Sequence, residues 1–269
     1  MSGFSATWLA MREPYDAQAR DGTVLNAVAA AFRHQPSISV VDLGCGTGAT
    51  LREIGPRLPA RQNWRLVDHD LGLLAHAATL SRPPDLTVVA RTVDLVRDLE
   101  IALDGPVDLI TMSALLDLVS AEWLERFVTE AAARRLPVYA ALSYDGKIML
   151  EPGDPFDHEI AEAVNRHQHR DKGFGPALGP DAAAHAAAGF ERVGYKLVRG
   201  RSDWVFAARD RAIQSELLAG WATAAQELGE LPARCIDDWL ARRRDLLAAG
   251  RSTMGVGHVD LFAAPMATR

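Results

Sequence analysis

The stretch from Ser39 to Thr50, S-V-V-D-L-G-C-G-T-G-A-T, constrains the fold more than any other part of the chain. Its first half is apolar and β-branched, which predicts a strand buried on both faces within a parallel sheet. Its second half places glycines at 44, 46 and 48 and continues into a short helix, 49–54. Glycines allow a tight turn and a close approach of the backbone to a ligand, while a helix N-terminus presents free N–H groups. This pattern predicts a nucleotide-binding α/β fold.

The spacing and charge of this loop limit which nucleotide ligands it could bind. A dinucleotide fingerprint has the form G-x-G-x-x-G, whereas this loop reads G-x-G-x-G and follows Asp42. A carboxylate beside the loop disfavours a pyrophosphate and suits a cationic ligand such as a sulfonium. A nicotinamide-dependent oxidoreductase is therefore the weaker interpretation.

Residues 41–48, V-D-L-G-C-G-T-G, resemble motif I of the class I S-adenosylmethionine (SAM)-dependent methyltransferases, of the form E/D-x-G-x-G-x-G. The resemblance implies a doubly wound, mostly parallel seven-stranded α/β sheet, with SAM as the cofactor. It also implies cofactor contacts from the acid and the loop: Asp42, Gly44, Cys45, Gly46 and Gly48. Cys45 is expected to face cofactor or core, not to act as a nucleophile.

Two further acids fit the cofactor. The second predicted strand, 64–67, ends at Asp68, where a βαβ unit places an acid for the ribose hydroxyls. Asp70 is the alternative ribose ligand, but it also suits the N-cap of a helix over 71–80. His69 is expected near the adenosine. Beyond a third strand, 86–90, the resemblance implies that Asp94 accepts from the adenine amino group and that the backbone of Leu95 contacts the ring.

The N-terminal segment predicts a leader helix over 5–34 that breaks near Pro14 and then resumes. In many small-molecule members of the family a leader helix closes over the cofactor. Arg12 or Arg20 could then pair with the methionine carboxylate of SAM. Solvated surface charge is the other interpretation of both arginines.

The methyl acceptor is expected beyond the carboxyl ends of the fourth and fifth strands, 107–112 and 136–144, because open parallel sheets bind ligands there. Ser113 opens the loop after the fourth strand and is a candidate cofactor contact. Asp117 is either an acceptor-binding group or base, or a surface acid before a helix over 120–133. Tyr144 ends the fifth strand on the same side. Asp117 and Tyr144 are therefore the candidate catalytic residues.

An insertion after the fifth strand, 146–180, carries a helix over 157–167 and a basic, aromatic-bearing loop in a chain with only three lysines. This loop is either a solvated connection or a lid over an anionic acceptor. As a lid, it offers three candidate substrate-binding residues: His167, Lys172 and Phe174. No third ligand joins His167 and His169 at a recognisable spacing, so no metal is expected.

The rest of the chain predicts a helix over 181–190 with Asp181 as N-cap, a strand over 195–198 and an extended piece over 203–206. Two amphipathic helices follow, 209–228 and 233–249, and then a last strand, 257–263. We expect one methyltransferase domain over 1–269. Its parts are a leader (1–35), a SAM-binding core (37–145), the lid-like insertion (146–180) and a C-terminal half (181–269) that contains the inserted helices (209–249).

Charge and composition limit the partners. The net charge of −6 disfavours a nucleic-acid substrate, which usually needs a basic surface. No apolar run reaches the length of a membrane span, the N-terminus lacks the pattern of a signal peptide, and the two cysteines lie far apart, so we expect a cytoplasmic protein. Methyl transfer from SAM to a small, anionic or amphoteric metabolite is the predicted function, and the sequence leaves the oligomeric state open. The alternatives are a catalytically silent SAM-binding regulatory or partner protein, and a methyltransferase acting on tRNA or protein.

Overall fold

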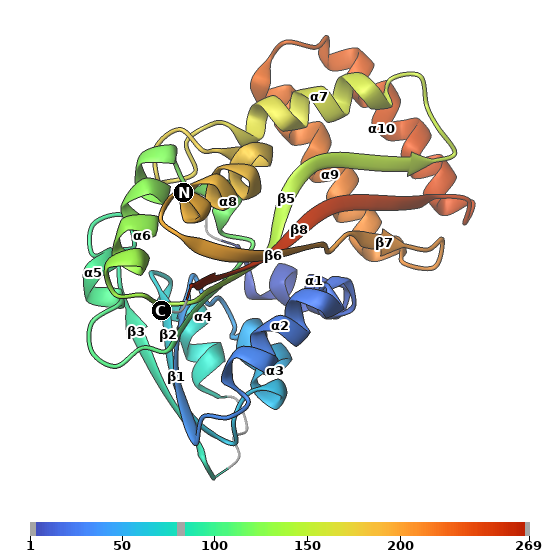
Figure 1. The fold of residues 1–269 in the computed structure, drawn as a ribbon. Coiled ribbons are helices and arrows are strands. Elements are labelled where there is room, and N and C mark those ends of the chain that lie inside the picture. The colour runs from blue at the N-terminus through green and yellow to red at the C-terminus, as the bar shows by residue number, and fades with distance from the viewer. Residues whose placement is uncertain (1–3, 80–83, 267–269) are drawn as a thin grey trace.

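The computed structural model describes residues 4–79 and 84–266, whose strands form one sheet in the order β3-β2-β1-β4-β5-β8-β6 (Figure 1). Strands β1 to β5 are parallel, and β8 runs antiparallel to both β5 and β6. A short strand, β7, pairs with β8 beyond the end of β6. The strands are β1 (Ser37–Leu43), β2 (Arg61–Asp68), β3 (Leu86–Thr92), β4 (Leu109–Ser113), β5 (Val138–Glu151), β6 (Tyr195–Arg201), β7 (Trp204–Phe206) and β8 (Thr253–Pro265).

Helices cover both faces of the sheet and a separate extension of it. The α-helices are α1 (Ala6–Ala19), α2 (Gly22–Phe32), α3 (Ala49–Ile54), α4 (Leu71–Ala78), α5 (Leu99–Ala102), α6 (Ala121–Ala133), α7 (Asp157–Gln168), α8 (Ala182–Arg192), α9 (Arg211–Leu228) and α10 (Ala233–Ala248). The 3₁₀ turns are η1 (Gly55–Arg57), η2 (Leu116–Leu118) and η3 (Gly179–Asp181).

Three apolar clusters hold these elements together. Side chains of α2, α3 and α4 pack on one face of the sheet, and side chains of α5, α6 and α8 pack on the other. The residues of β1 alternate between the two clusters, with Val40 in one and Val41 in the other, which explains its continuous apolar run. Removal of this apolar surface from water is the main stabilising term of the fold.

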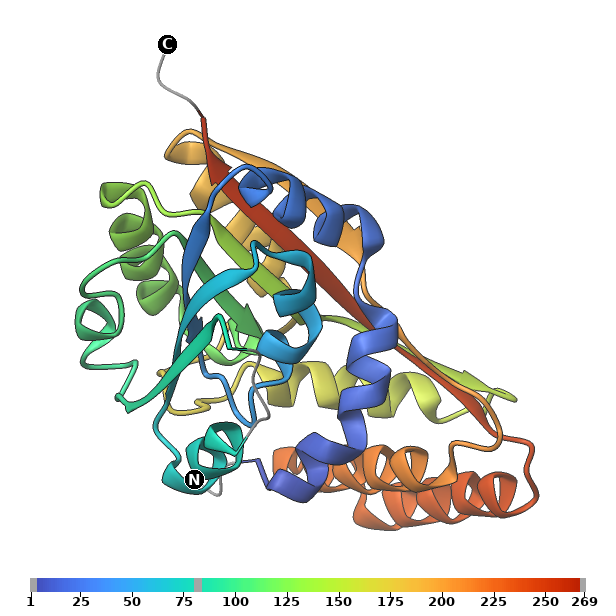
Figure 2. The ribbon, with the colours of Figure 1, turned by 90° about the horizontal axis from the view of Figure 1, so that it is seen from below.

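The third cluster lies beside the sheet. Both β5 and β8 continue past its parallel part as a long ribbon, and α7, α9 and α10 pack against that ribbon together with β7 (Figure 1). Helix α1 adds Trp8, Met11 and Tyr15 to the same cluster and crosses toward the glycine-bearing loop after β1 (Figure 2). The ribbon therefore brings the C-terminal helices to the side of the sheet where β1 and β4 end.

The expected α/β sheet, with a helical insertion before an antiparallel last strand, is confirmed, but several local predictions are wrong. The sheet has eight strands, because the extended piece expected at 203–206 pairs with β8 as β7. The fifth strand continues to Glu151 instead of ending at Tyr144, because β8 supplies backbone partners as far as Thr253.

Two helix predictions are also wrong. The leader helix does not break at Pro14: α1 runs through it to Ala19, and the chain turns only at Asp21, which caps α2. Packing on the third cluster and the i,i+4 pair of Arg12 and Asp16 hold this helix across the lost backbone hydrogen bond. Asp181 precedes α8 without a side-chain capping bond, because it already belongs to η3. Leu80, the expected end of the helix that begins at Leu71, lies outside the described residues.

Candidate active site

The loop between β1 and α3 uses its three glycines for the backbone conformations that the motif predicts. Gly44, Gly46 and Gly48 have φ values of 63°, 53° and 82°, a region that other residues rarely adopt. The Cys45 amide donates to Val67 O at 2.9 Å, which ties the loop to β2. Burial raises the pKa of the Cys45 thiol, which disfavours the thiolate that a cysteine nucleophile needs.

Asp68, at the end of β2, lies against this loop. Its Oδ2 accepts from the Gly46 amide at 2.9 Å and its Oδ1 accepts from the Asp70 amide at 3.0 Å. Asp70 instead caps α4, where its Oδ1 accepts from Gly72 N at 2.7 Å and Leu73 N at 3.1 Å. The His69 side chain is 77% exposed beside them. Of the two acids, only Asp68 contacts the glycine loop.

Asp42 lies beneath the loop, fully buried. Its Oδ1 accepts from the Thr111 hydroxyl at 2.7 Å, while its Oδ2 has no partner among the described residues. Burial raises the pKa of this carboxyl to about 7, against the smaller opposing effects of Thr111 and Arg20.

Arg20 is the buried cation of this region. Its Nη2 donates to Ser113 Oγ at 3.1 Å and its Nη1 donates to the Tyr139 hydroxyl at 3.2 Å. Its Nε is buried and has no partner among the described residues. Arg20 also forms no direct ion pair with any of those residues. Arg20 thus joins the end of α1 to the end of β4 beside Asp42.

Helix α1 covers the glycine loop. A Cβ placed on Gly46 would lie 3.1 Å from Leu9 Cδ1, and Glu13 forms an ion pair with Arg52 of α3. Arg52 in turn donates to Thr47 O at 2.7 Å. A small cavity of about 70 Å³ remains between these helices, with Arg20 in its wall. Helix α1 therefore lies over the glycine loop, while its closure over a cofactor stays a prediction.

The segment after β3 approaches the same place. Val93 N donates to Asp68 O at 3.1 Å, and the buried Leu95 accepts from the Trp123 indole at 2.7 Å through its carbonyl. The Asp94 side chain is exposed and accepts from Val96 N at 2.9 Å. Asp94 and Leu95 therefore follow directly after Val93, whose amide contacts the Asp68 carbonyl.

The predicted acceptor side contains a buried acid. Asp117 lies in η2, directly after β4, and is 7% exposed, with no partner for its Oδ1 among the described residues. Burial raises its pKa to about 6, and the charges of Arg12 and Lys172 and the backbone of Tyr144 oppose that rise. The Tyr144 hydroxyl donates to Asn165 Oδ1 at 2.8 Å. Asp117 is therefore no surface acid.

The loop after α7 is fastened to this region. It bridges to the start of α6 at Val119 and Ser120, and Phe174 packs edge-on against Trp123 at 5.4 Å. Lys172 Nζ lies 3.2 Å from His167 Nδ1, and His167 Nε2 lies 2.9 Å from Glu227 Oε2. Of the three predicted lid residues, Phe174 therefore packs against an apolar side chain, whereas His167 and Lys172 belong to a chain of polar contacts.

Sequence reasoning missed a group that β7 and β8 bring to the same region. The Arg12 guanidinium lies 5.0 Å from the Trp204 ring, and Trp204 donates to Asp16 at 2.9 Å. His258 packs 4.7 Å from Trp204, and burial lowers its pKa to about 4, so it is neutral near pH 7. No sequence signal marks Trp204 or His258, because their proximity to Arg12 depends on the pairing of β7 with β8.

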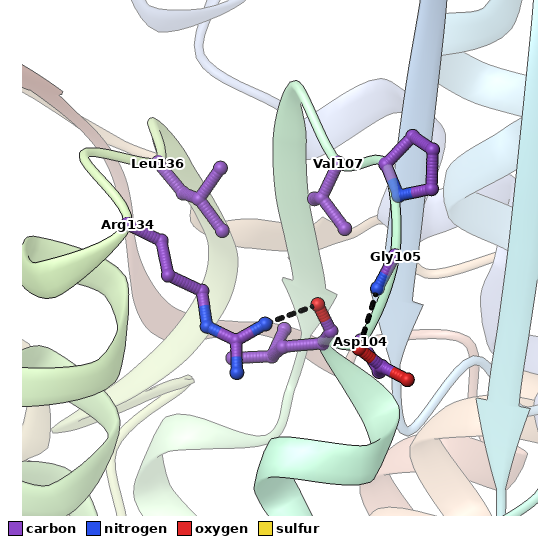
Figure 3. A pocket seen from close by; sticks show the side chains of 7 residues that line it. Asp104, Gly105, Val107, Arg134 and Leu136 are labelled. Carbon is purple, nitrogen blue, oxygen red and sulfur yellow. Dashed lines mark hydrogen bonds between the residues drawn. The ribbon is translucent and has the colours of Figure 1, made fainter.

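A second cavity, of about 490 Å³, lies elsewhere (Figure 3). Its walls come from the turn before β4 and the turn before β5, at the amino ends of strands, and include Asp104, Gly105 and Arg134. The glycine loop and Asp117 lie at the carboxyl ends of β1 and β4, the other edge of the sheet.

Within residues 4–79 and 84–266 no cluster of three or more His, Cys, Asp or Glu side chains could hold a metal ion. In the same part of the chain, no helix combines the length and apolarity of a membrane span.

Comparison with known proteins agrees with this geometry. Residues 40–136, which contain the glycine loop, Asp68 and Asp117, match the family model described as a methyltransferase domain. The resemblance to the class I enzymes is thereby confirmed for the part of the chain that carries motif I.

Several solved structures resemble this chain at low sequence identity. A cyclopropane-fatty-acyl-phospholipid synthase-like protein from Lactobacillus casei is 15% identical with a TM-score of 0.51, and the match covers 97% of this chain and 94% of that chain. A SAM-dependent methyltransferase from Thiobacillus denitrificans, in complex with S-adenosylhomocysteine (SAH), is 17% identical over 97% and 99% of the two chains, with a TM-score of 0.46. A SAM-dependent methyltransferase from Geobacter sulfurreducens, also with SAH, is 15% identical over 98% and 100%, with a TM-score of 0.44. No curated protein matches the chain.

Proposed function

We propose that this methyltransferase transfers a methyl group from SAM to a small metabolite held beyond β4 and β5. The observation that carries the proposal is the contact of the buried Asp68 carboxylate with the Gly46 amide, within a glycine loop covered by α1. The domain match over residues 40–136 supports the reaction class, and the acidic net charge favours a small molecule over a nucleic acid.

The residues around the loop fit SAM. Asp68 would hold the ribose, with Asp94 and the backbone of Leu95 at the adenine. For the methionine carboxylate, Arg20 is a better candidate than Arg12, because Arg20 lies in the wall of the cavity beside α3 and its buried Nε has no partner among the described residues. Asp42 lies beneath the loop, and a ligand with positive charge there would favour the ionised form of its carboxyl.

When bound, SAM supplies an activated methyl group on a sulfonium, which transfers by in-line displacement. The protein then acts by positioning the acceptor and excluding water. The cover of α1 over Gly46 excludes water from the cofactor side. Asp117, with its pKa raised to about 6, is ionised near pH 7 and can take a proton from an acceptor that must lose one. Tyr144 borders the same space through its backbone.

Calorimetric titration with SAM and SAH tests the cofactor assignment. The wild type is expected to bind both, and Asp68→Ala is expected to weaken binding at least about tenfold through the loss of hydrogen bonds to a carboxylate. Asp70→Ala is the matched control: it removes the cap of α4, costs about 1 kcal/mol of stability, and leaves SAH binding intact.

The outcomes separate the alternatives. Failure of the wild type to bind SAM or SAH would refute the proposal. Binding without methyl transfer to any metabolite in a broad screen would favour a silent regulatory protein. Methyl transfer that requires RNA or a protein acceptor would move the substrate to tRNA or protein.

A further inference from the structure

Three charged groups meet at the acceptor side of the site. The β-bridge between Val119 and Phe174 ties the end of η2, which carries Asp117, to the loop after α7, which carries Lys172. Ring contacts run from Arg12 through Trp204 and His258 to Tyr144 of β5. The charges of Arg12 and Lys172 both act on Asp117, yet no direct ion pair joins Asp117 to either cation in residues 4–79 and 84–266. Each group also keeps hydrogen-bonding capacity that its neighbours do not use.

Arg12 is buried, and its guanidinium uses only part of its hydrogen-bonding capacity. Its Nε donates to Asp16 Oδ2 at 2.9 Å and its guanidinium lies over the Trp204 ring, while its two Nη atoms make no hydrogen bond to any described residue. The indole ring and Asp16 fix the plane of the guanidinium. An arginine held in this way presents a rigid pair of donors, which suits a carboxylate or a phosphate.

Lys172 is held without being neutralised. Its ammonium donates to His167 Nδ1 at 3.2 Å, which leaves the His167 Nε2 proton to donate to Glu227 at 2.9 Å. Within the described parts of the chain Lys172 has no carboxylate at ion-pair distance. The chain from Glu227 through His167 therefore orients the lysine and leaves its charge available.

Asp117 offers a hydrogen-bond acceptor, whereas Arg12 and Lys172 offer donors. Its Oδ1 is buried without a partner among the residues described, which costs free energy unless a donor reaches it. A ligand N–H or O–H is such a donor. Neither Arg12 nor Lys172 contacts Asp117 directly, so neither cation supplies the missing donor.

We propose that the methyl acceptor is amphoteric: Arg12 and Lys172 bind its anionic group, and Asp117 Oδ1 accepts a hydrogen bond from its N–H or O–H nucleophile. This inference rests on the proposed function. It assigns Arg12 to the acceptor, not to the cofactor, and it excludes acceptors that carry no anion.

Three probes of related shape test the recognition on protein saturated with SAH: 4-aminobenzoate carries both groups, benzoate only the anion, and aniline only the amine. Binding followed by calorimetry is expected to be strongest for 4-aminobenzoate and weakest for aniline. Lys172→Gln is expected to weaken both carboxylates about tenfold and leave aniline unchanged, because one charge-assisted hydrogen bond is lost. Lys196→Gln, at an exposed lysine of β6, is the matched control and should change nothing.

Three further variants separate recognition from folding. Arg12→Gln is expected to act as Lys172→Gln does, and Arg12→Lys, which keeps the charge, should restore part of the carboxylate binding. Asp117→Ala should abolish the advantage of 4-aminobenzoate over benzoate. No binding of either carboxylate to the wild type, or equal losses for all three probes in Lys172→Gln, would overturn the inference. Failure of SAH to bind would instead refute the proposed function.

Discussion

Neighbouring acids in this protein have different roles because their side chains meet different backbone groups. Asp68 and Asp70 are two residues apart, yet one accepts from Gly46 of the glycine loop and the other caps α4. An acid between strand and helix can do either, since both environments offer free N–H groups. The preference for Asp68 as the acid nearer the cofactor loop followed from its position at the end of the strand.

Asp42 gives a prediction about pH. Burial raises its pKa from 3.8 to about 7 in the folded protein, so between these values the carboxyl is protonated when folded and ionised when unfolded. Its contribution to stability is complete below the unfolded pKa and is lost as the pH rises through the folded one. We expect Asp42→Asn to remove about 2 kcal/mol of the fall in unfolding free energy between about pH 5 and about pH 8.

Urea unfolding at a series of pH values measures this slope. Asp238→Asn, at an exposed residue of α10, serves as control and should leave the slope unchanged. If Asp42→Asn and the wild type lost stability in parallel as the pH rises, the carboxyl would be ionised in the folded protein.

Helix α1 continues through Pro14, although proline inside a helix normally ends or kinks it. Pro14 removes one backbone hydrogen bond, but the helix on either side is held by the third apolar cluster and by the pair of Arg12 and Asp16. Tertiary contacts of this kind routinely outweigh helix propensity. The uninterrupted helix carries Leu9 over Gly46 and Glu13 to Arg52, so its continuity serves the cover of the loop.

This gives a prediction about Pro14, which is exposed. Pro14→Ala restores a backbone donor inside α1 and should raise the unfolding free energy by about 1 to 2 kcal/mol, because the helix-interior penalty of proline exceeds its entropic benefit in the unfolded chain. Thermal and urea unfolding measure the change. Pro14→Gly should gain less than Pro14→Ala, since glycine is the poorer helix former. A loss of stability in Pro14→Ala would show that α1 is adapted to the proline.

At the scale of the whole molecule, the C-terminal helices depend on a buried ion pair. Arg243 of α10 is 0% exposed; its guanidinium pairs with Asp157 and donates to Pro152 O at 2.7 Å. The Trp239 indole donates to the same carboxylate at 2.8 Å. This network joins α10 to the turn between β5 and α7, and so to the long ribbon of the sheet.

Adjacent arginines allow a matched test. Arg243→Ala leaves a buried carboxylate without its partner and should lower the unfolding free energy by about 3 to 5 kcal/mol. Arg242→Ala breaks a pair with Asp154 at a side chain that is 49% exposed, and should cost much less than Arg243→Ala because solvent screens that pair. Urea unfolding of the two variants compares them directly. Equal costs would mean that the buried pair does not hold the third cluster in place.

The sequence alone determined the glycine loop, the sheet around it and the acid at the end of β2. These features depend on short-range physics: apolar runs form buried strands, glycines permit left-handed turns, and acids at strand ends meet free amides. The same reasoning located Asp117 and Tyr144 on one side of the sheet, while their catalytic roles stay predictions.

Only the tertiary structure decided what surrounds Asp117. Arg12, Trp204 and His258 are far apart in the chain and lie on α1, β7 and β8, and they meet because β8 pairs with both the extended β5 and β7. Periodicity and motif spacing report on neighbours within one element, whereas such a meeting depends on which strands pair and on how far each one continues. The burial of Asp117, its unpartnered oxygen and the cations near it therefore lay beyond what the sequence could predict.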